Sequence, residues 1–194
     1  MPRPPELSDR AVALKPSLTL EISAKAKALR DSGQDICSLS AGEPDFNTPP
    51  FIVEAAQRAM ASGFTRYGPA AGDPELRAAL ALKLSVENRI PTQPEQVLIT
   101  NGGKQAIYNL FQVLLNPGDE VLLSSPYWLS YPEMAALAGA STTIVPTKAD
   151  EGFQLDLDLL EQHITPRSRL LVINSPGNPS GRVMPRAELE ALAE

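Results

Sequence analysis

The sequence contains one cysteine, Cys37, among its 194 residues. A single cysteine cannot form a disulfide within the chain, and such sequences are typical of proteins from reducing compartments. We therefore expect a cytoplasmic protein. Because Ile36 and Leu39 flank this position, we expect the thiol to pack as a small buried hydrophobe.

Long apolar runs are missing as well. No run approaches the roughly 18–20 residues that a membrane-spanning helix requires. The first ten residues, MPRPPELSDR, have no apolar core of the kind found in a signal peptide. The sequence therefore predicts no membrane partner.

Basic charge, histidine and nucleotide motifs are also scarce. Seventeen Lys and Arg face 23 Asp and Glu, giving a net charge of −6 without a basic block, which disfavours nucleic acid as a partner. The only histidine, His163, has no second histidine or cysteine nearby, so no metal site is expected. Neither the Walker spacing nor Gly-x-Gly-x-x-Gly occurs, so a nucleotide is not the favoured ligand.

Apolar residues and proline are plentiful, and they divide the chain into regular segments. The apolar fraction is 43%, and 19 prolines stand mostly between periodic stretches. Helical periodicity and end signals predict helices over residues 18–30, 50–60, 74–88, 104–114, 131–137 and 156–162, and a last helix that Pro185 opens. Residues 52, 53, 56 and 59 of the second helix are expected to face inward.

Short apolar runs predict strands over residues 96–100, 120–124, 141–145 and 169–174. The last of these lacks alternation, so we expect it to be buried on both faces. Strands that alternate with helices from residue 95 onward indicate an α/β fold with a mostly parallel sheet.

A glycine turn stands between the first predicted strand and the helix that follows it. Asn101, Gly102 and Gly103 lead directly into Lys104 and the helix. The unpaired N–H groups of a helix start form an anion site, most naturally for a phosphate. Glycines in a plain, closely packed turn would give the same pattern, so both interpretations stay open on this segment.

Two further loops follow predicted strands and should lie at the same edge of the sheet, where α/β proteins bind ligands. One carries Tyr127 and Trp128, and the other runs from Asn174 to Gly181. An aromatic plane beside an anion site suits a flat, charged cofactor ring. Taken singly, Trp128 could instead be a core residue, and residues 178–181 could be an ordinary β-turn.

Five segments in this order resemble the class I aminotransferases: Gly42-Glu43-Pro44-Asp45-Phe46, Tyr67-Gly68, Gly102-Gly103-Lys104-Gln105-Ala106, Pro126-Tyr127-Trp128, and Asn174-Ser175-Pro176-Gly177-Asn178-Pro179-Ser180-Gly181. The resemblance covers residues 14–194 and is nearest to the bacterial aspartate aminotransferase branch, some members of which also accept prephenate. That family uses pyridoxal 5′-phosphate on the fold type I architecture. The resemblance implies an incomplete three-layer large domain over residues 46–194, after an N-terminal arm, helix and small-domain segment in residues 1–45.

The resemblance also implies roles for individual residues. Gly102, Gly103 and Lys104 would bind the cofactor phosphate through the backbone and the helix start. Trp128 would stack on the pyridine ring, and Asn178 would hydrogen-bond its phenolic oxygen.

Further residues are implied to bind substrate or a second subunit. Gly42, Trp128 and Asn178 would bind the substrate, with the Gly42 backbone at its carboxylate and Asn178 close to it. Lys15 would lie in a segment that passes close to the substrate. Tyr67 would reach the cofactor phosphate of the neighbouring subunit, which makes a homodimer part of the site. The substrates implied are an L-amino acid and a 2-oxo acid.

Family members are about twice as long, and their second half carries the lysine that forms the Schiff base and the aspartate that pairs with the pyridine nitrogen. None of the six lysines matches that catalytic position: Lys15, Lys25, Lys27, Lys83, Lys104 and Lys148. The final helix stops at Glu194 without a cap. We therefore expect a truncated chain, whether fragment, frameshift product or half of a split enzyme, with no catalytic residue and no activity by itself.

Two alternatives stay open. A non-catalytic relative, such as a transcription regulator, would carry a DNA-binding region, but residues 1–40 show neither helix-turn-helix spacing nor a basic face. Another fold type I enzyme, a carbon–sulfur lyase or an amino-acid synthase, would share residues like Tyr67 and Asn178. The Gly-Gly-Lys-Gln and Pro-Tyr-Trp segments favour the aminotransferase.

Overall fold

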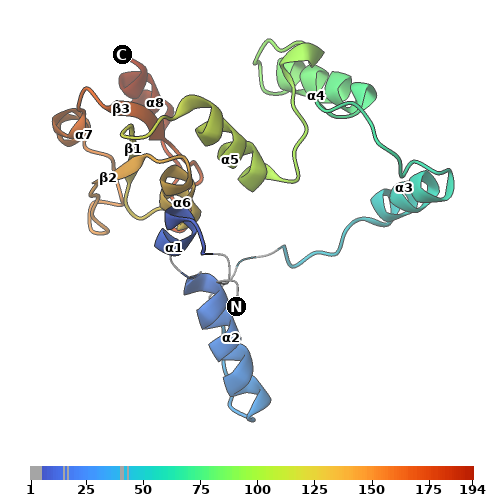
Figure 1. The fold of residues 1–194 in the computed structure, drawn as a ribbon, viewed down its shortest axis with the longest axis horizontal. Coiled ribbons are helices and arrows are strands. Elements are labelled where there is room, and N and C mark those ends of the chain that lie inside the picture. Colours follow the sequence, from blue (N-terminus) through green and yellow to red (C-terminus); the bar gives the residue numbers. More distant parts are fainter. Residues whose placement is uncertain (1–5, 15, 17, 40–41, 43) are drawn as a thin grey trace. The chain divides into compact units, whose positions relative to one another are not determined.

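The computed structural model describes residues 6–14, 16, 18–39, 42 and 44–194 (Figure 1). The chain divides into two compact units. The first unit comprises Met1–Lys15 and Gly103–Glu194, and the second comprises Pro16–Gly102. Each unit has its own elements and is described separately.

A three-stranded parallel sheet organises the first unit. Its strands are β1 (Glu120–Ser124), β2 (Ser141–Val145) and β3 (Ser168–Val172), in the order β2-β1-β3. β1 and β2 match the predicted bounds, and β3 begins one residue before its predicted start and ends two residues before its predicted end. The predicted parallel sheet is therefore confirmed for these three strands.

Among the described residues of this unit, five helices accompany the sheet: α1 (Asp9–Ala13), α5 (Gly103–Leu114), α6 (Ser130–Leu137), α7 (Leu157–His163) and α8 (Arg186–Ala193). Alternate residues of β1 point to opposite faces, as in any strand. Val121 and Leu123 belong to one buried cluster with residues of α5 and α6, while Leu122 belongs to another with residues of α7. Helices thus cover both faces of the sheet, which is the three-layer arrangement that the resemblance implies (Figure 1).

The strand predicted over residues 169–174, which is β3 in the structure, was expected to be buried on both faces, and this expectation is wrong. Most of β3 is half-buried and Arg169 is exposed, whereas Val121, Leu122 and Leu123 of β1 are all buried. The difference follows from strand order, because β1 has a neighbour on each side and β3 stands at an edge of the sheet. An edge strand of this composition leaves apolar surface and backbone groups open.

The second unit is helical, with α2 (Leu18–Asp31), α3 (Pro50–Ala61), α4 (Pro74–Val86) and the short 3₁₀ helix η1 (Pro94–Gln96). The predicted N-cap of α4 is confirmed, because the Asp73 carboxylate accepts from the Leu76 N–H at 3.0 Å. No helix in the described part of the chain is long and apolar enough to cross a membrane.

The strand predicted over residues 96–100 is wrong. Gln96 ends η1, and the backbone after it bonds outside any sheet. The Ile99 N–H donates to the Ala71 carbonyl at 3.0 Å, and the Arg77 Nε donates to the Val97 carbonyl at 2.9 Å. The apolar pattern therefore reflects packing against a neighbouring loop and helix rather than a strand ladder.

Two burial predictions in this unit are also wrong. Ile52 and Val53 on α3 are 46% and 41% exposed, and only Ala59 of the expected inward face is half-buried. Cys37 is exposed, as is Leu39. Local periodicity predicted an apolar face for α3, but most of that face is exposed.

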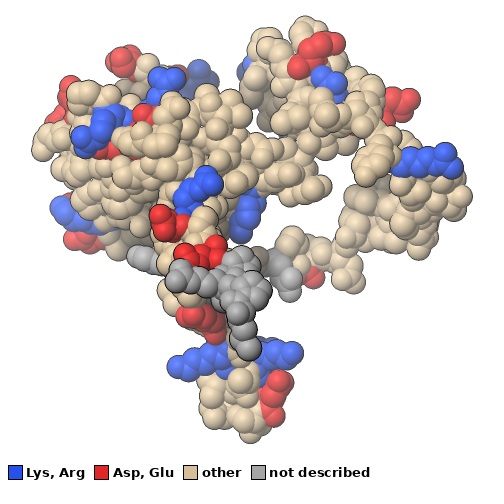
Figure 2. All heavy atoms as spheres, in the orientation of Figure 1, with Lys and Arg blue, Asp and Glu red and all other residues tan. Residues whose placement is uncertain are grey.

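Charged side chains of both signs are interspersed over the visible face, and no extended patch of one sign forms among the residues coloured in Figure 2. This agrees with the absence of a basic block in the sequence.

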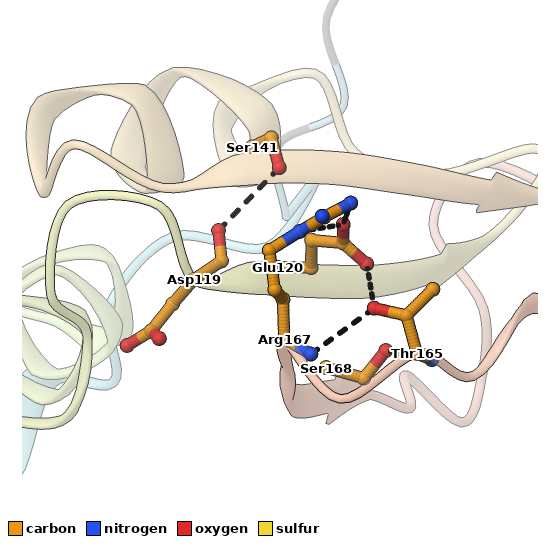
Figure 3. A network of polar contacts seen from close by, with 6 residues as sticks. All are labelled: Asp119, Glu120, Ser141, Thr165, Arg167 and Ser168. Carbon is orange, nitrogen blue, oxygen red and sulfur yellow. Dashed lines mark hydrogen bonds and ion pairs between the residues drawn. The ribbon is translucent and has the colours of Figure 1, made fainter.

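A polar network holds the start of β1 to the loop before β3 (Figure 3). Glu120 is buried, and its carboxylate accepts from Thr165 Oγ1 at 2.8 Å and from Arg167 Nε at 2.7 Å. The hydrogen bond from Thr165, followed by that from Arg167, lowers the pKa of the Glu120 carboxyl. This network lies at the amino ends of the strands, opposite the edge at which parallel sheets bind ligands.

Replacing Glu120 with glutamine is expected to lower the melting temperature at pH 7 by about 5 °C. Since the folded-state pKa is below the usual value of 4.5, the carboxylate stabilises the fold above pH 4.5, and this contribution is lost as the pH falls through the folded-state pKa. The deficit of the variant should therefore shrink in melts recorded from pH 7 down to pH 3.

Glu190→Gln is the control, because that carboxylate forms an exposed ion pair with Arg186 on α8. Exposed pairs contribute little, so its melting temperature should change by about 1 °C or less. Equal shifts in the two variants would contradict a special role for Glu120.

Candidate functional site

The glycine turn predicted before this helix is present at the start of α5. Gly102 has φ +82°, a left-handed conformation that favours glycine, and Thr100 Oγ1 donates to its carbonyl at 3.0 Å. Gly103 is the first residue of the 12-residue helix. A Cβ added at either glycine would meet nothing within 4 Å among the described residues. The glycines do not serve close packing here, which favours the phosphate interpretation.

Lys104 and Trp128, predicted from separate loops, lie together. The Lys104 ammonium is 4.8 Å from the centroid of the Trp128 ring, within the range of a cation–π contact. Lys104 is in the first turn of α5, and Trp128 follows β1. The structure therefore brings a positive charge, a helix start and an aromatic plane to one place in the first unit.

Trp128 proves to be partly a core residue and partly accessible. It is half-buried and packs against the cluster that contains Phe111 and Met134. The Tyr131 ring meets it edge-on, with centroids 5.3 Å apart and planes at 87°. Tyr131 itself is buried, which raises the pKa of its hydroxyl. These contacts fix the orientation of the indole.

The loop after β3 is a closed turn that presents Asn178 on its exposed side. The Gly177 N–H donates to the Arg182 carbonyl at 2.8 Å, and the Gly181 N–H donates to the Gly177 carbonyl at 2.7 Å. A Cβ on Gly177 would lie 2.6 Å from Ser180 Oγ, so a larger residue there would require the Ser180 side chain to turn away. The segment can therefore be a turn and still present the Asn178 side chain to a ligand.

Asn178 is held by Asn174, whose Oδ1 accepts from the Asn178 N–H at 2.8 Å. Both loops follow neighbouring parallel strands, so Trp128 and Asn178 lie at the carboxyl edge of the sheet. Sequence reasoning missed Asn174 and Tyr131 as supports. The available signals were an amide four residues before Asn178 and an aromatic residue three positions after Trp128.

Replacing Asn174 with alanine is expected to speed hydrogen exchange at the Asn178 amide by about three- to tenfold, because one hydrogen bond contributes about 0.5–1.5 kcal/mol. Asn174→Asp keeps an acceptor oxygen at the same position and serves as the control. Exchange rates measured by NMR should be near wild type in Asn174→Asp, and an equal increase in both variants would contradict the assigned bond.

The remaining predicted site residues belong to the second unit or lie outside the described residues. Gly42 and Tyr67 are exposed in the second unit. Lys15 lies outside the described residues. The roles of all three stay predictions, as do the roles of Gly102, Gly103, Lys104, Trp128 and Asn178 toward a bound cofactor. Among the described residues, no group of three or more His, Cys, Asp or Glu side chains could hold a metal ion.

Comparison with known families gives a clear result: the model of aminotransferase class I and II matches residues 34–194. The chain belongs to this aminotransferase family. An aspartate/prephenate aminotransferase of Thermus thermophilus is 54% identical over 187 residues, which is 96% of this chain and 49% of that protein. A bifunctional aspartate and glutamate/aspartate-prephenate aminotransferase of Petunia hybrida is 50% identical over 97% of this chain and 39% of its own length.

Solved structures agree. The aspartate aminotransferase from Thermus thermophilus with maleate superposes with a TM-score of 0.93 at 53% identity, over 97% of this chain and 50% of that one. The Thermotoga maritima aspartate aminotransferase gives 0.90 at 41% identity, over 96% of this chain and 50% of its own. The predicted fold type I architecture is confirmed, and the chain spans about half the length of the relatives it matches.

Aminotransferases of this family use pyridoxal phosphate. The residues described above fit such a group: a helix start and an ammonium suit its phosphate, and a fixed indole suits its flat ring. An exposed amide, Asn178, is available at the same edge of the sheet.

Proposed function

We propose that this chain is the N-terminal part of an aminotransferase that moves an amino group between an L-amino acid, aspartate or glutamate, and a 2-oxo acid. The observation that carries the proposal is the meeting of Lys104 and Trp128 at the start of α5. A plain α/β core domain has no need of a lysine ammonium over a half-buried indole beside an open helix start.

In this proposal the backbone of Gly102 and Gly103 and the start of α5 bind the cofactor phosphate, with Lys104 adding positive charge. Trp128 supports one face of the cofactor ring. The Asn178 amide donates a hydrogen bond to the ring's phenolic oxygen. When bound, pyridoxal phosphate supplies the electron sink for the reaction, and these residues bind and orient it.

We further propose that Gly42 contacts the substrate carboxylate and that Tyr67 reaches the phosphate of a second subunit, so that the working enzyme is a homodimer. The division into an arm and small-domain segment over residues 1–45 and a large domain over residues 46–194 belongs to the same proposal, as does a cytoplasmic location. The lone Cys37 is compatible with that location.

The 194-residue chain is proposed to be inactive by itself. Transamination needs a lysine that holds the cofactor and moves the substrate's α-proton. None of the six lysines of this chain stands in that sequence context, and Lys104 is at the phosphate end of the proposed site. A regulator or a lyase is less favoured, because the relatives reported above are all named aminotransferases.

The test is a pair of measurements on the 194-residue chain. Pyridoxal phosphate should bind, seen as broadening of its ³¹P resonance, yet aspartate and 2-oxoglutarate should show no turnover above that of free pyridoxal phosphate. Asn178→Ala should weaken binding about threefold, and Lys148→Ala, at an exposed lysine paired with Glu151, should not. Turnover by the chain alone would contradict the proposed inactivity. A ³¹P resonance of pyridoxal phosphate that does not broaden would contradict the proposed site.

A further inference from the structure

The contact between Lys104 and Trp128 joins one rigid and one flexible partner. Trp128 is fixed by the edge-on Tyr131 ring and by the buried cluster beneath it. Lys104 is exposed, and its long side chain can adopt many conformations. Of the two, only the lysine is free to move without disturbing the core.

The position of the ammonium conflicts with a stacked ligand. A flat ring packed on an indole takes the space next to its face, and the Lys104 ammonium stands 4.8 Å from the ring centroid. Trp128 also packs against the cluster that contains Phe111, so only part of the indole is open. A ring that stacks on the face of Trp128 that Lys104 covers must therefore displace Lys104.

A phosphate at the start of α5 gives the displaced ammonium a better partner. The first-turn N–H groups belong to the same turn as Lys104, so an anion bound there lies within reach of its side chain. A charge-assisted hydrogen bond to phosphate is stronger than an exposed cation–π contact. The same anion that occupies the helix start therefore draws Lys104 off the indole.

We propose that Lys104 is a displaceable cap on Trp128, which couples phosphate binding at the start of α5 to stacking of a flat ring on the indole. This inference rests on the proposed function, since it takes the α5 start to be the phosphate site. The consequence is selectivity for phosphorylated aromatic rings. The phosphate of such a ligand draws Lys104 away from Trp128, so that its ring can stack on the indole. An unphosphorylated ring must displace Lys104 without that compensation.

The cap can be tested without any ligand, because Trp128 is the only tryptophan of the chain. Lysine stems shield apolar surface, so Lys104→Ala is expected to raise the acrylamide quenching constant of Trp128 emission about twofold. Lys104→Arg should restore the wild-type value, since guanidinium groups also stack on aromatic faces. The matched control, Lys148→Ala, removes the same charge from an exposed lysine paired with Glu151 and should leave quenching unchanged.

The coupling is tested with inorganic phosphate at constant ionic strength. In the wild-type chain, phosphate should raise the acrylamide quenching constant of Trp128 toward that of Lys104→Ala. In Lys104→Ala itself, phosphate should still bind, with an affinity about tenfold lower as measured by broadening of its ³¹P resonance. Its binding should leave the quenching constant of that variant unchanged. Lys104→Arg and Lys148→Ala should respond as wild type does.

The outcomes separate this inference from the proposed function. Quenching that is the same in Lys104→Ala and wild type overturns the cap. The coupling is overturned if phosphate binds the wild-type chain without changing its quenching constant. It is also overturned if phosphate changes the quenching constant of Lys104→Ala as much as that of wild type. Phosphate that binds no variant overturns the proposed site and the coupling together, while the ligand-free quenching result still decides whether Lys104 caps Trp128.

Discussion

Replacing Phe111 with alanine is expected to lower the free energy of unfolding of the first unit by about 3–5 kcal/mol. Phe111 is 2% exposed and lies in the cluster beneath Trp128, together with Val121, Leu123 and Met134. Truncation removes the buried ring and leaves a cavity that surrounding side chains fill only in part. Because small domains are stable by only about 5–15 kcal/mol, the loss is a large share of the total.

The measurement is urea unfolding followed through Trp128 emission, which reports on the first unit alone because it is the only tryptophan. Val113→Ala is the matched control on α5, since that side chain is 80% exposed and its loss should cost about 0.5 kcal/mol or less. If the two variants unfold at the same urea concentration, Phe111 does not anchor α5 to the sheet.

Replacing Gly72 with alanine is expected to destabilise the second unit by about 3 kcal/mol, from two separate causes. Gly72 has φ +102°, where an L side chain is strained. A Cβ there would lie 2.3 Å from Ile99 Cγ1 and 2.5 Å from Ile99 Cβ, so the backbone or Ile99 must shift. That shift would break the bond from the Ile99 N–H to the Ala71 carbonyl.

Hydrogen exchange at the Ile99 amide measures this effect, with an increase of about a hundredfold for a loss of this size. Gly63→Ala is the matched control, because Gly63 has φ +81° and a Cβ there meets nothing within 4 Å. That variant carries only backbone strain of about 1–2 kcal/mol, which is confined to the turn at residue 63. Exchange at the Ile99 amide should therefore stay near wild type. Unchanged exchange at Ile99 in Gly72→Ala would contradict the close approach of these two segments.

Local signals in the sequence predicted most helices and the sheet strands well. The N-cap at Asp73, the change of period after Gly103 and the β-branched run at residues 141–145 all depend on neighbours in sequence. Such features are decided by backbone dihedrals and capping bonds within a few residues. The ordered segments containing Gly42, Tyr67, Lys104, Trp128 and Asn178 also predicted the aminotransferase family, which the comparisons confirm.

Local signals failed where burial depends on distant neighbours. Residues 96–100 have a strand-like pattern, yet their backbone bonds to Ala71 and Arg77 instead of another strand. Likewise, β3 has the composition of a central strand but stands at an edge. Cys37 is flanked by apolar residues, yet it is exposed. Periodicity shows which face of an element is apolar, but not what covers it.

The sequence by itself determined the family, the three strands of the sheet with most of the helices, and the residues proposed for the phosphate, the ring and the amide contact. Only the tertiary structure decided that Lys104 lies over Trp128, that Tyr131 fixes the indole and that Asn174 holds Asn178. The reason is physical. Helix starts and turns follow from neighbouring residues, whereas the contact of Lys104 with Trp128 joins residues 24 positions apart, which only the packing of α5 and α6 on β1 brings together.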